Sequence, residues 1–205
     1  MDAVSTHQYE VIIIGAGISG MYQLHCLREL GMNVRVFETA DDVGGTWYWN
    51  RYPGARFDSE SYSYGYSFSE ELLQEWEWEE HFSAQPETLR YLNHVADKFD
   101  LRKHIEFQTR IESARYDKTK NLWHVSCSQG RTACAPFLIT ALGPISVPTL
   151  PNITGLDSFR GEAYHTGLWP HEPIDFRDKR VAVIGTGATG VQVIQEVAKS
   201  AGHLS

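Results

Sequence analysis

Two glycine triplets of the form G-x-G-x-x-G are the residues in this sequence best suited to organise chemistry. The first triplet comprises Gly15, Gly17 and Gly20. The second comprises Gly185, Gly187 and Gly190. In such a triplet the first glycine allows a tight turn, the second lets a pyrophosphate approach the backbone, and the third lets a helix pack against a strand. The pyrophosphate then lies at the helix N-terminus, where free N–H groups and the helix dipole stabilise an anion.

Glu38 supports a dinucleotide site at the first triplet. The apolar run 10–15 predicts a buried parallel strand, residues 21–30 predict a helix, and residues 33–38 predict a second strand. Gly31 is predicted to end the helix. This order is a βαβ unit, and it places Glu38 at the end of the second strand, 18 residues after Gly20. A carboxylate at that point can accept a hydrogen bond from a ribose hydroxyl. The alternative is that these glycines serve only a tight turn.

The second triplet repeats the pattern near the end of the sequence. Residues 179–185 form a second apolar run, and residues 191–200 predict a helix. We expect the chain to stop at Ser205 before the second strand of this unit, so the residue that would distinguish NAD from NADP is absent. Two such sites in one chain indicate two dinucleotides that exchange electrons, typically a permanently held flavin and a nicotinamide that visits.

Other elements must connect and position the two triplets. Residues 41–68 are irregular, aromatic and glycine-rich. Residues 70–78 and 86–99 predict two helices. Residues 106–116 and 122–127 predict two strands of a small antiparallel sheet, and residues 137–143 predict one more buried strand. Three prolines within eight residues, beginning at Pro144, then mark a stiff linker.

The predicted fold class is therefore α/β, with two Rossmann-like dinucleotide-binding domains of the three-layer type, the second of them incomplete. Residues 1–143 form the predicted first domain, which would hold the flavin. Residues 144–178 form an interdomain linker, and residues 179–205 begin the second domain, which would hold the nicotinamide dinucleotide.

The composition excludes several classes of partner. The 205 residues include 18 basic and 26 acidic side chains, and the net charge of −8 argues against nucleic acid or an anionic membrane surface as a partner. No apolar run approaches the ~20 residues of a membrane helix, and the first residues lack the features of a secretory signal. Three scattered cysteines, Cys26, Cys127 and Cys134, are too few for a disulfide framework, and no histidine spacing indicates a metal site. We therefore expect a cytoplasmic protein without a metal.

Two longer motifs resemble those of a known enzyme family. Residues 159–170, FRGEAYHTGLWP, resemble the fingerprint F-x-G-x-x-x-H-x-x-x-W-P of type I Baeyer–Villiger monooxygenases, and they lie between the two triplets, as in that family. The fixed positions are Phe159, Gly161, His165, Trp169 and Pro170. Residues 44–58, GGTWYWNRYPGARFD, resemble the second family signature, G-G-x-W-x-x-x-x-[FY]-P-G-x-x-x-D. The loop is most similar to those of the branch that acts on aryl, cyclic or steroid ketones.

The resemblance implies a reaction and its partners. In this family NADPH reduces FAD, the reduced flavin captures dioxygen as a peroxyflavin, and the peroxide converts a ketone to an ester or lactone. The implied partners are a ketone, dioxygen and the remaining C-terminal part of the enzyme, because family members are more than twice as long as this chain. We therefore expect that these 205 residues alone cannot turn over substrate.

The resemblance also implies two sets of cofactor contacts. Those at FAD are Gly15, Gly17, Ser19, Gly20, Glu38, Gly45, Thr46, Trp47, Tyr48, Trp49, Asp58, Tyr64 and Ile111. Those at NADP are Arg56, Phe57, Asp58, Gly185, Thr186, Gly187, Ala188, Thr189, Gly190 and Gln192.

Individual roles follow from the same resemblance. Asp58 is implied to position an active-site arginine that lies outside this sequence. His165 is implied to couple domain conformations rather than to transfer protons, and Trp169 to pack at the hinge. The aromatic side chains of Trp47, Tyr48, Trp49 and Tyr52 either wall the flavin against water or pack as an ordinary core under a long loop.

Two other functions remain open. One is a flavin monooxygenase that oxygenates sulfur or nitrogen, although Trp169-Pro170 argues against it. The other is a flavin-binding fragment or subunit without catalysis, which the missing arginine favours.

Overall fold

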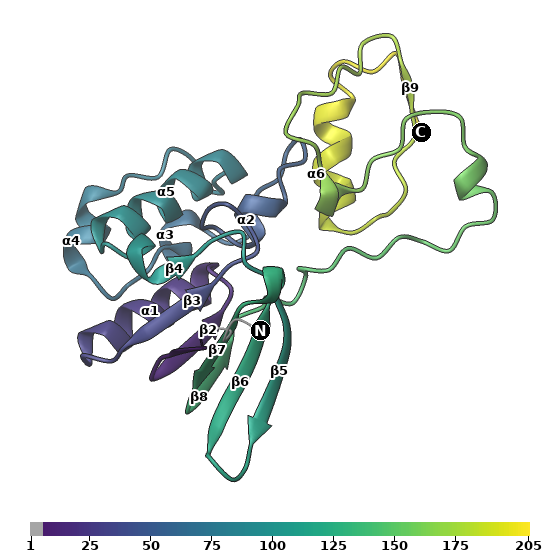
Figure 1. Ribbon diagram of the computed structural model, residues 1–205. Helices are drawn as coiled ribbons and strands as arrows, with labels where there is room; N and C mark the ends of the chain where they lie inside the picture. Colours follow the sequence, from purple (N-terminus) through teal and green to yellow (C-terminus); the bar gives the residue numbers. More distant parts are fainter. Residues whose placement is uncertain (1–5) are drawn as a thin grey trace. The chain divides into compact units, whose positions relative to one another are not determined.

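The computed structural model describes residues 6–205, and the chain divides into two compact units (Figure 1). The first unit contains the chain up to Tyr48 and Leu92–Pro144. The second contains Trp49–Tyr91 and Ile145–Ser205. The sequence signature at residues 44–58 therefore belongs partly to each unit.

A four-stranded parallel sheet forms the centre of the first unit. Its order is β4-β3-β2-β8, and the strands are β2 (Val11–Ile14), β3 (Val34–Phe37), β4 (Ile105–Glu106) and β8 (Phe137–Thr140). Val11, Ile12 and Ile13 are buried because a central parallel strand is covered on both faces. This sheet confirms the predicted α/β class and the strands expected near residues 10–15, 33–38 and 137–143. The prediction that the last of these strands is buried is wrong, because Phe137 and Thr140 at its two ends are exposed.

Helix α1 (Ile18–Glu29) connects β2 to β3 and covers one face of the parallel sheet (Figure 1). The helix ends as predicted at Gly31, whose φ of +75° is left-handed. The N–H groups of Gly31 and Met32 donate to the carbonyls of Arg28 and Leu27, at 2.8 and 3.1 Å. These two bonds satisfy otherwise open helix carbonyls and form a Schellman motif.

A second four-stranded sheet packs on the other face. Its order is β1-β7-β6-β5, and the strands are β1 (Thr6–Gln8), β5 (Ile111–Asp117), β6 (Leu122–Cys127) and β7 (Thr132–Ala135). The core between the sheets contains Ile12 and Phe37 from the first sheet and Val125, Cys127 and Ala133 from the second. Helix, parallel sheet and second sheet give the predicted three layers (Figure 1).

The single strand predicted over 106–116 is wrong in its extent. Its beginning, β4, joins the parallel sheet beside β3, whereas β5 begins at Ile111 and pairs with β6 in the antiparallel sheet. Gln108 lies between them with a left-handed φ of +52°, which no strand continues through. The chain therefore changes sheets at this residue.

The irregular region of the second unit is held by short helices. Helix α2 (Thr46–Trp49) begins in the first unit, and α3 (Ser61–Tyr64) and α4 (Glu70–Glu75) follow. Helix α5 (Gln85–Lys98) continues from the second unit into the first. The predicted helix over 70–78 ends early, because Trp76 has an extended backbone. Single 3₁₀ turns lie at Arg102–His104, Ser128–Gly130, Leu156–Ser158 and Thr166–Leu168.

The second glycine triplet lies in a βαβ unit of β9 (Arg180–Val181), α6 (Ala188–Val197) and β10 (His203–Leu204). Strands β9 and β10 pair in parallel. The expectation that the chain stops before the second strand is therefore wrong. Helix α6 ends at Val197, earlier than predicted, and the turn after it brings the chain back so that Ser205 N–H donates to the Val181 carbonyl at 3.0 Å.

Among residues 6–205, no helix combines the length and apolar character needed to cross a membrane. Of the three free cysteines, Cys127 and Cys134 are buried and Cys26 is half-buried.

The close approach of α1 to β2 generates a stability prediction. A Cβ atom at Gly20 would collide with the Gly15 carbonyl oxygen, whereas one at Gly31 would meet nothing within 4 Å. We expect Gly20→Ala to lower the free energy of unfolding by about 3 kcal/mol through overpacking. Gly31→Ala should cost only about 1 kcal/mol, from its left-handed backbone. Urea unfolding measures both, and equal losses would contradict the packing role of Gly20.

Candidate cofactor-binding sites

The first glycine triplet forms a turn with no room for side chains. Gly15 has a left-handed φ of +103°, and a Cβ on it would lie 2.5 Å from the carbonyl oxygen of Ala141. Gly17 precedes the first turn of α1 with an extended backbone. Ser19 is exposed in that turn, and Gly20 packs its Cα against the Gly15 carbonyl. The triplet therefore has the turn and the packing predicted for it.

The Gly44-Gly45 segment lies against this turn. Gly44 N–H donates to the Ala16 carbonyl at 3.1 Å, and a Cβ on Gly45 would lie 2.8 Å from the Cα of Gly17. Gly17 and Gly45 thus face each other, and a side chain on either residue would collide with the backbone of the other. The arrangement leaves bare backbone at the N-terminus of α1, which a pyrophosphate requires.

Glu38 lies beside the same turn and is 5% exposed. Its two carboxylate oxygens accept hydrogen bonds from the N–H groups of Ala16, at 2.6 Å, and Ala40, at 2.8 Å. The carboxylate therefore ties the end of β3 to the glycine turn. Each oxygen keeps further acceptor capacity that a ribose hydroxyl could use.

The remaining predicted FAD contacts of the first unit lie in α2, directly after Gly45, and at the start of β5. Thr46 and Tyr48 are half-buried and Trp47 is buried, all in α2. The Tyr48 hydroxyl donates to Asp41 at 2.5 Å. Ile111, at the start of β5, packs against the core between the two sheets.

An ionic network supports the 41–45 segment and was missed by the sequence analysis. The guanidinium of Arg102 donates to Asp42, to Asn93 and, at 2.5 Å, to Asp97. Asp42 also accepts the N–H of Val43 at 2.7 Å. The signal available was the spacing of Asn93 and Asp97, which places both on one face of α5. Nothing local in the sequence connects them to Asp42.

The second triplet repeats the backbone geometry of the first, although a Cβ on Gly185 or Gly187 would meet nothing within 4 Å. Gly185 has a left-handed φ of +123°, Gly187 precedes α6 with an extended backbone, and a Cβ on Gly190 would collide with the Gly185 carbonyl. Thr186 and Ala188 are exposed, and Thr189 is half-buried. The open N–H groups at the start of α6 thus lie in an accessible turn that can receive an anion.

The second unit brings two predicted NADP contacts together. The side-chain amide of Gln192 on α6 donates to the backbone carbonyl of Arg56 at 2.9 Å. The Arg56 side chain turns to Glu80, at 3.0 Å. Asp58, two residues later, is exposed. Tyr52 is 9% exposed and packs with Val193 and Val197, so for this residue the core-packing alternative is favoured.

Aromatic rings surround the end of this signature. Phe57 stacks on Tyr64 with ring centroids 4.2 Å apart and planes 7° apart, and Trp78 meets Phe57 edge-on. Trp78 also contacts Tyr91, with ring centroids 4.9 Å apart. Trp49, another predicted FAD contact, is 40% exposed. This cluster fixes Phe57 and Tyr64 as one rigid surface.

The fingerprint residues make local contacts. The ring of Phe159 covers Gly161, where a Cβ would lie 2.6 Å from it. His165 Nδ1 accepts the N–H of Gly167 at 3.0 Å and caps a 3₁₀ turn. Trp169, next to the half-buried Pro170, packs on the core of the second unit. His165 therefore stabilises a local turn through a hydrogen bond, and Trp169 packs against a hydrophobic core.

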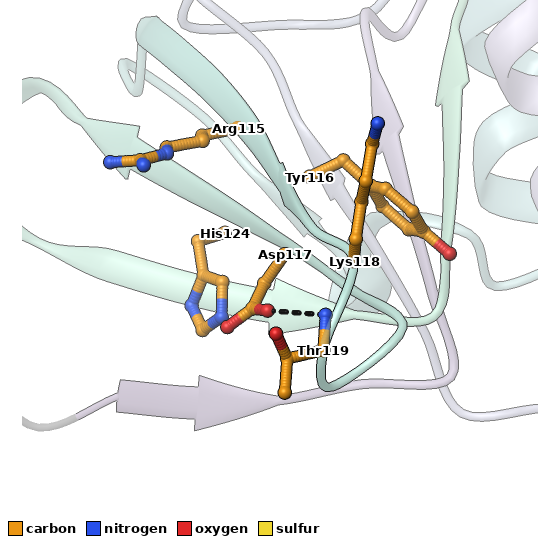
Figure 2. A pocket seen from close by; sticks show the side chains of 6 residues that line it. All are labelled: Arg115, Tyr116, Asp117, Lys118, Thr119 and His124. Carbon is orange, nitrogen blue, oxygen red and sulfur yellow. Dashed lines mark hydrogen bonds between the residues drawn. The ribbon is translucent and has the colours of Figure 1, made fainter.

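The β5–β6 hairpin borders a hollow of about 560 Å³, and none of the six residues that line it is a predicted cofactor contact (Figure 2). Asp117 accepts the backbone N–H groups of Lys120 and Thr119, which lower its carboxyl pKa below the usual value. Arg115 and Lys118 point in different directions around the hollow (Figure 2). It is the concave side of a hairpin turn, and its side chains do not converge on one point. Within the described part of the chain, no three His, Cys, Asp or Glu side chains gather as a metal site.

The aromatic cluster generates a pH prediction. Burial raises the pKa of Tyr91 to about 12, and its neutral hydroxyl oxygen accepts the Tyr66 N–H at 2.7 Å. The unfolded state ionises this phenol near pH 10, so its contribution to stability is complete below pH 10 and is lost as pH rises towards 12. Tyr91→Phe should cost about 1–2 kcal/mol at pH 7, because the Tyr66 N–H loses its acceptor. Urea unfolding from pH 7 to 12 should show this difference shrinking above pH 10, and a constant difference would contradict it.

Comparisons with known proteins identify relatives of this chain. A model of the flavin-binding monooxygenase-like family matches residues 8–204. The chain is 49% identical over 201 residues to the acetone monooxygenase (methyl acetate-forming) of Gordonia sp. strain TY-5, covering 98% of this chain and 38% of the relative. It is 46% identical over 206 residues to the phenazine N-monooxygenase of Lysobacter antibioticus, covering 100% of this chain and 38% of that relative.

A solved structure shares the fold. The complex of OTEMO with FAD and NADP matches with a TM-score of 0.92 at 47% identity, covering 98% of this chain and 39% of that one. The chain thus spans less than two fifths of the length of the relatives it matches. The match along residues 8–204, together with the two glycine turns, shows that the chain belongs to the flavin-binding monooxygenase-like family.

Proposed function

We propose that the chain is the FAD- and NADP(H)-binding part of a monooxygenase that converts ketones to esters or lactones with dioxygen. The observation that carries this proposal is the repeated geometry of two glycine turns, in each of which a left-handed glycine is followed by an extended glycine at a helix N-terminus. The match to a complex with FAD and NADP supports the pair of cofactors. The identity to a methyl acetate-forming acetone monooxygenase supports oxygen insertion next to a ketone carbonyl.

The first turn fits FAD. Gly17 and Gly45 keep the backbone bare where the pyrophosphate would lie, and Glu38 stands ready for a ribose hydroxyl. Trp47 and Tyr48 offer rigid aromatic surface that would exclude water from an isoalloxazine ring. When bound, FAD supplies the activation of dioxygen, which no protein side chain can perform.

The second turn fits NADP(H). The N–H groups at the start of α6 and the hydroxyls of Thr186 and Thr189 can hold its pyrophosphate. Arg56, Phe57 and the exposed Asp58 belong to the same unit as this turn, and we assign them to the nicotinamide end. Asp58 is proposed to position an arginine supplied by the remaining C-terminal part of the enzyme. We place the protein in the cytoplasm, which three free cysteines suit.

A second candidate is oxygenation of nitrogen. The identity of 46% to a phenazine N-monooxygenase favours it specifically. The Trp169-Pro170 pair of the ketone-oxygenating fingerprint favours the first candidate. Incubation of this chain, together with the remaining C-terminal part of the enzyme, with NADPH and either acetone or phenazine, followed by mass spectrometry of the products, separates the two.

A visible absorption spectrum of the purified protein, before and after anaerobic NADPH, tests the cofactor assignment. We expect a flavin band that NADPH bleaches. Gly17→Val should abolish the band, because its side chain would fill the pyrophosphate position. Gly187→Val should keep the band and prevent bleaching. A band that survives Gly17→Val would contradict FAD at the first turn. Gly130→Ala is the control for lost stability, because its φ of +73° strains the substituted backbone and Gly130 belongs to neither triplet.

A further inference from the structure

The loop Tyr52–Arg56 is attached to α6 by contacts that the two sequence signatures do not explain. Gly54 has a left-handed φ of +81°, and a Cβ on it would lie 2.6 Å from the Gln192 carbonyl oxygen. The loop backbone therefore touches the helix backbone directly, and only glycine permits this approach. Tyr52 adds a buried ring beside Val193 and Val197, one turn of α6 apart.

The Gln192 side chain lies at the centre of this attachment. Its Oε1 accepts the hydroxyl of Tyr52 at 2.8 Å and the backbone N–H of Arg56 at 3.4 Å. Its Nε2 donates to the backbone carbonyl of Arg56 at 2.9 Å. The loop thus uses both the oxygen and the nitrogen of the Gln192 side-chain amide. This amide accepts from the N–H of Arg56 and donates to its carbonyl, as two residues of neighbouring antiparallel strands do.

The position of Gln192 connects this loop to the second glycine turn. Gln192 follows Gly190 by two residues in the first half of α6, and the Tyr52 hydroxyl lies 3.4 Å from Thr189 Oγ1. On the loop, Asp58 follows Arg56 by two residues. A side chain of the nucleotide-binding helix therefore sets the backbone from which Asp58 projects.

We propose that Gln192 is a positioning residue that holds the Tyr52–Asp58 segment in place for the nicotinamide of NADP(H). This inference rests on the proposed function, because it assigns the second turn to that nucleotide. It differs from the family-based expectation that Gln192 is itself a nucleotide ligand. Arg56 has a second attachment, through its side chain to Glu80 and the Phe82 carbonyl, so loss of Gln192 should loosen the segment without unfolding it.

Gln192→Met tests the proposal, because methionine keeps the length of the side chain and removes all three hydrogen bonds. Gln195→Met is the matched control, since Gln195 is exposed on the same helix. Hydrogen exchange of the Arg56 amide reports the attachment without any cofactor. We expect exchange about tenfold faster in Gln192→Met. The control and amides of the β5–β6 hairpin should be unchanged.

Tyr52→Phe tests whether the bonds act as a unit. Each single variant should speed exchange of the Arg56 amide, and the double variant should exchange no faster than Gln192→Met alone, because the two side chains share one interaction. Additive effects would overturn the proposal, and so would unchanged exchange in Gln192→Met.

Functional readouts then separate positioning from ligation. A positioning role predicts that Gln192→Met binds NADP⁺ within about twofold of the parent, measured by calorimetry, and that NADPH reduces the flavin about tenfold more slowly. If nucleotide affinity also falls, Tyr52→Phe decides: slowed flavin reduction supports positioning, and parent-like reduction overturns it. If the parent protein binds no NADP⁺, the proposed function fails, whereas the exchange result still reports on the attachment.

Discussion

The structure depends on the close approach between a helix and the carbonyl oxygen of the turn that precedes it. In the first unit Gly20 lies against the Gly15 carbonyl, and in the second Gly190 lies against the Gly185 carbonyl. Any side chain at the third glycine would push the helix away from its strand. The N–H groups of the first helical turn would then no longer lie beside the glycine turn. One steric requirement therefore fixes both the packing of α1 and α6 and the presentation of an anion site.

The signature at residues 44–58 serves the two turns in different ways. Near its start, the backbone of Gly45 packs directly against the backbone of Gly17. At the Pro53-Gly54 turn, the backbone of Gly54 packs against the carbonyl of Gln192. Between these points the chain passes from the first unit to the second, inside the four-residue helix α2. A signature that looks like a single aromatic loop in the sequence is thus two backbone contacts with aromatic side chains between them.

Local rules predicted much of the fold. Apolar runs ending in glycine identified β2 and β8, the helix-ending role of Gly31 was correct, and the family resemblance of the two signatures is confirmed. The missed features depend on contacts between distant residues. Gln108 ends one strand and redirects the chain with a left-handed backbone, which glutamine rarely adopts and which the sequence therefore does not predict. Likewise, no spacing rule connects Tyr52 to Gln192 or Arg102 to Asp42, because only the folded chain brings them together.

The arrangement of the central strand has a consequence for how the chain folds during synthesis. Strand β2 pairs with β3, 23 residues later in register, but its other neighbour begins only at Phe137, 126 residues after Val11. A ribosome therefore exposes most of this chain before the second edge of β2 can be covered. Until then a strand of consecutive valine and isoleucine residues has an open edge, which favours pairing with other chains. Closure of the parallel sheet therefore waits for β8, and until then the edge of β2 is open to such pairing.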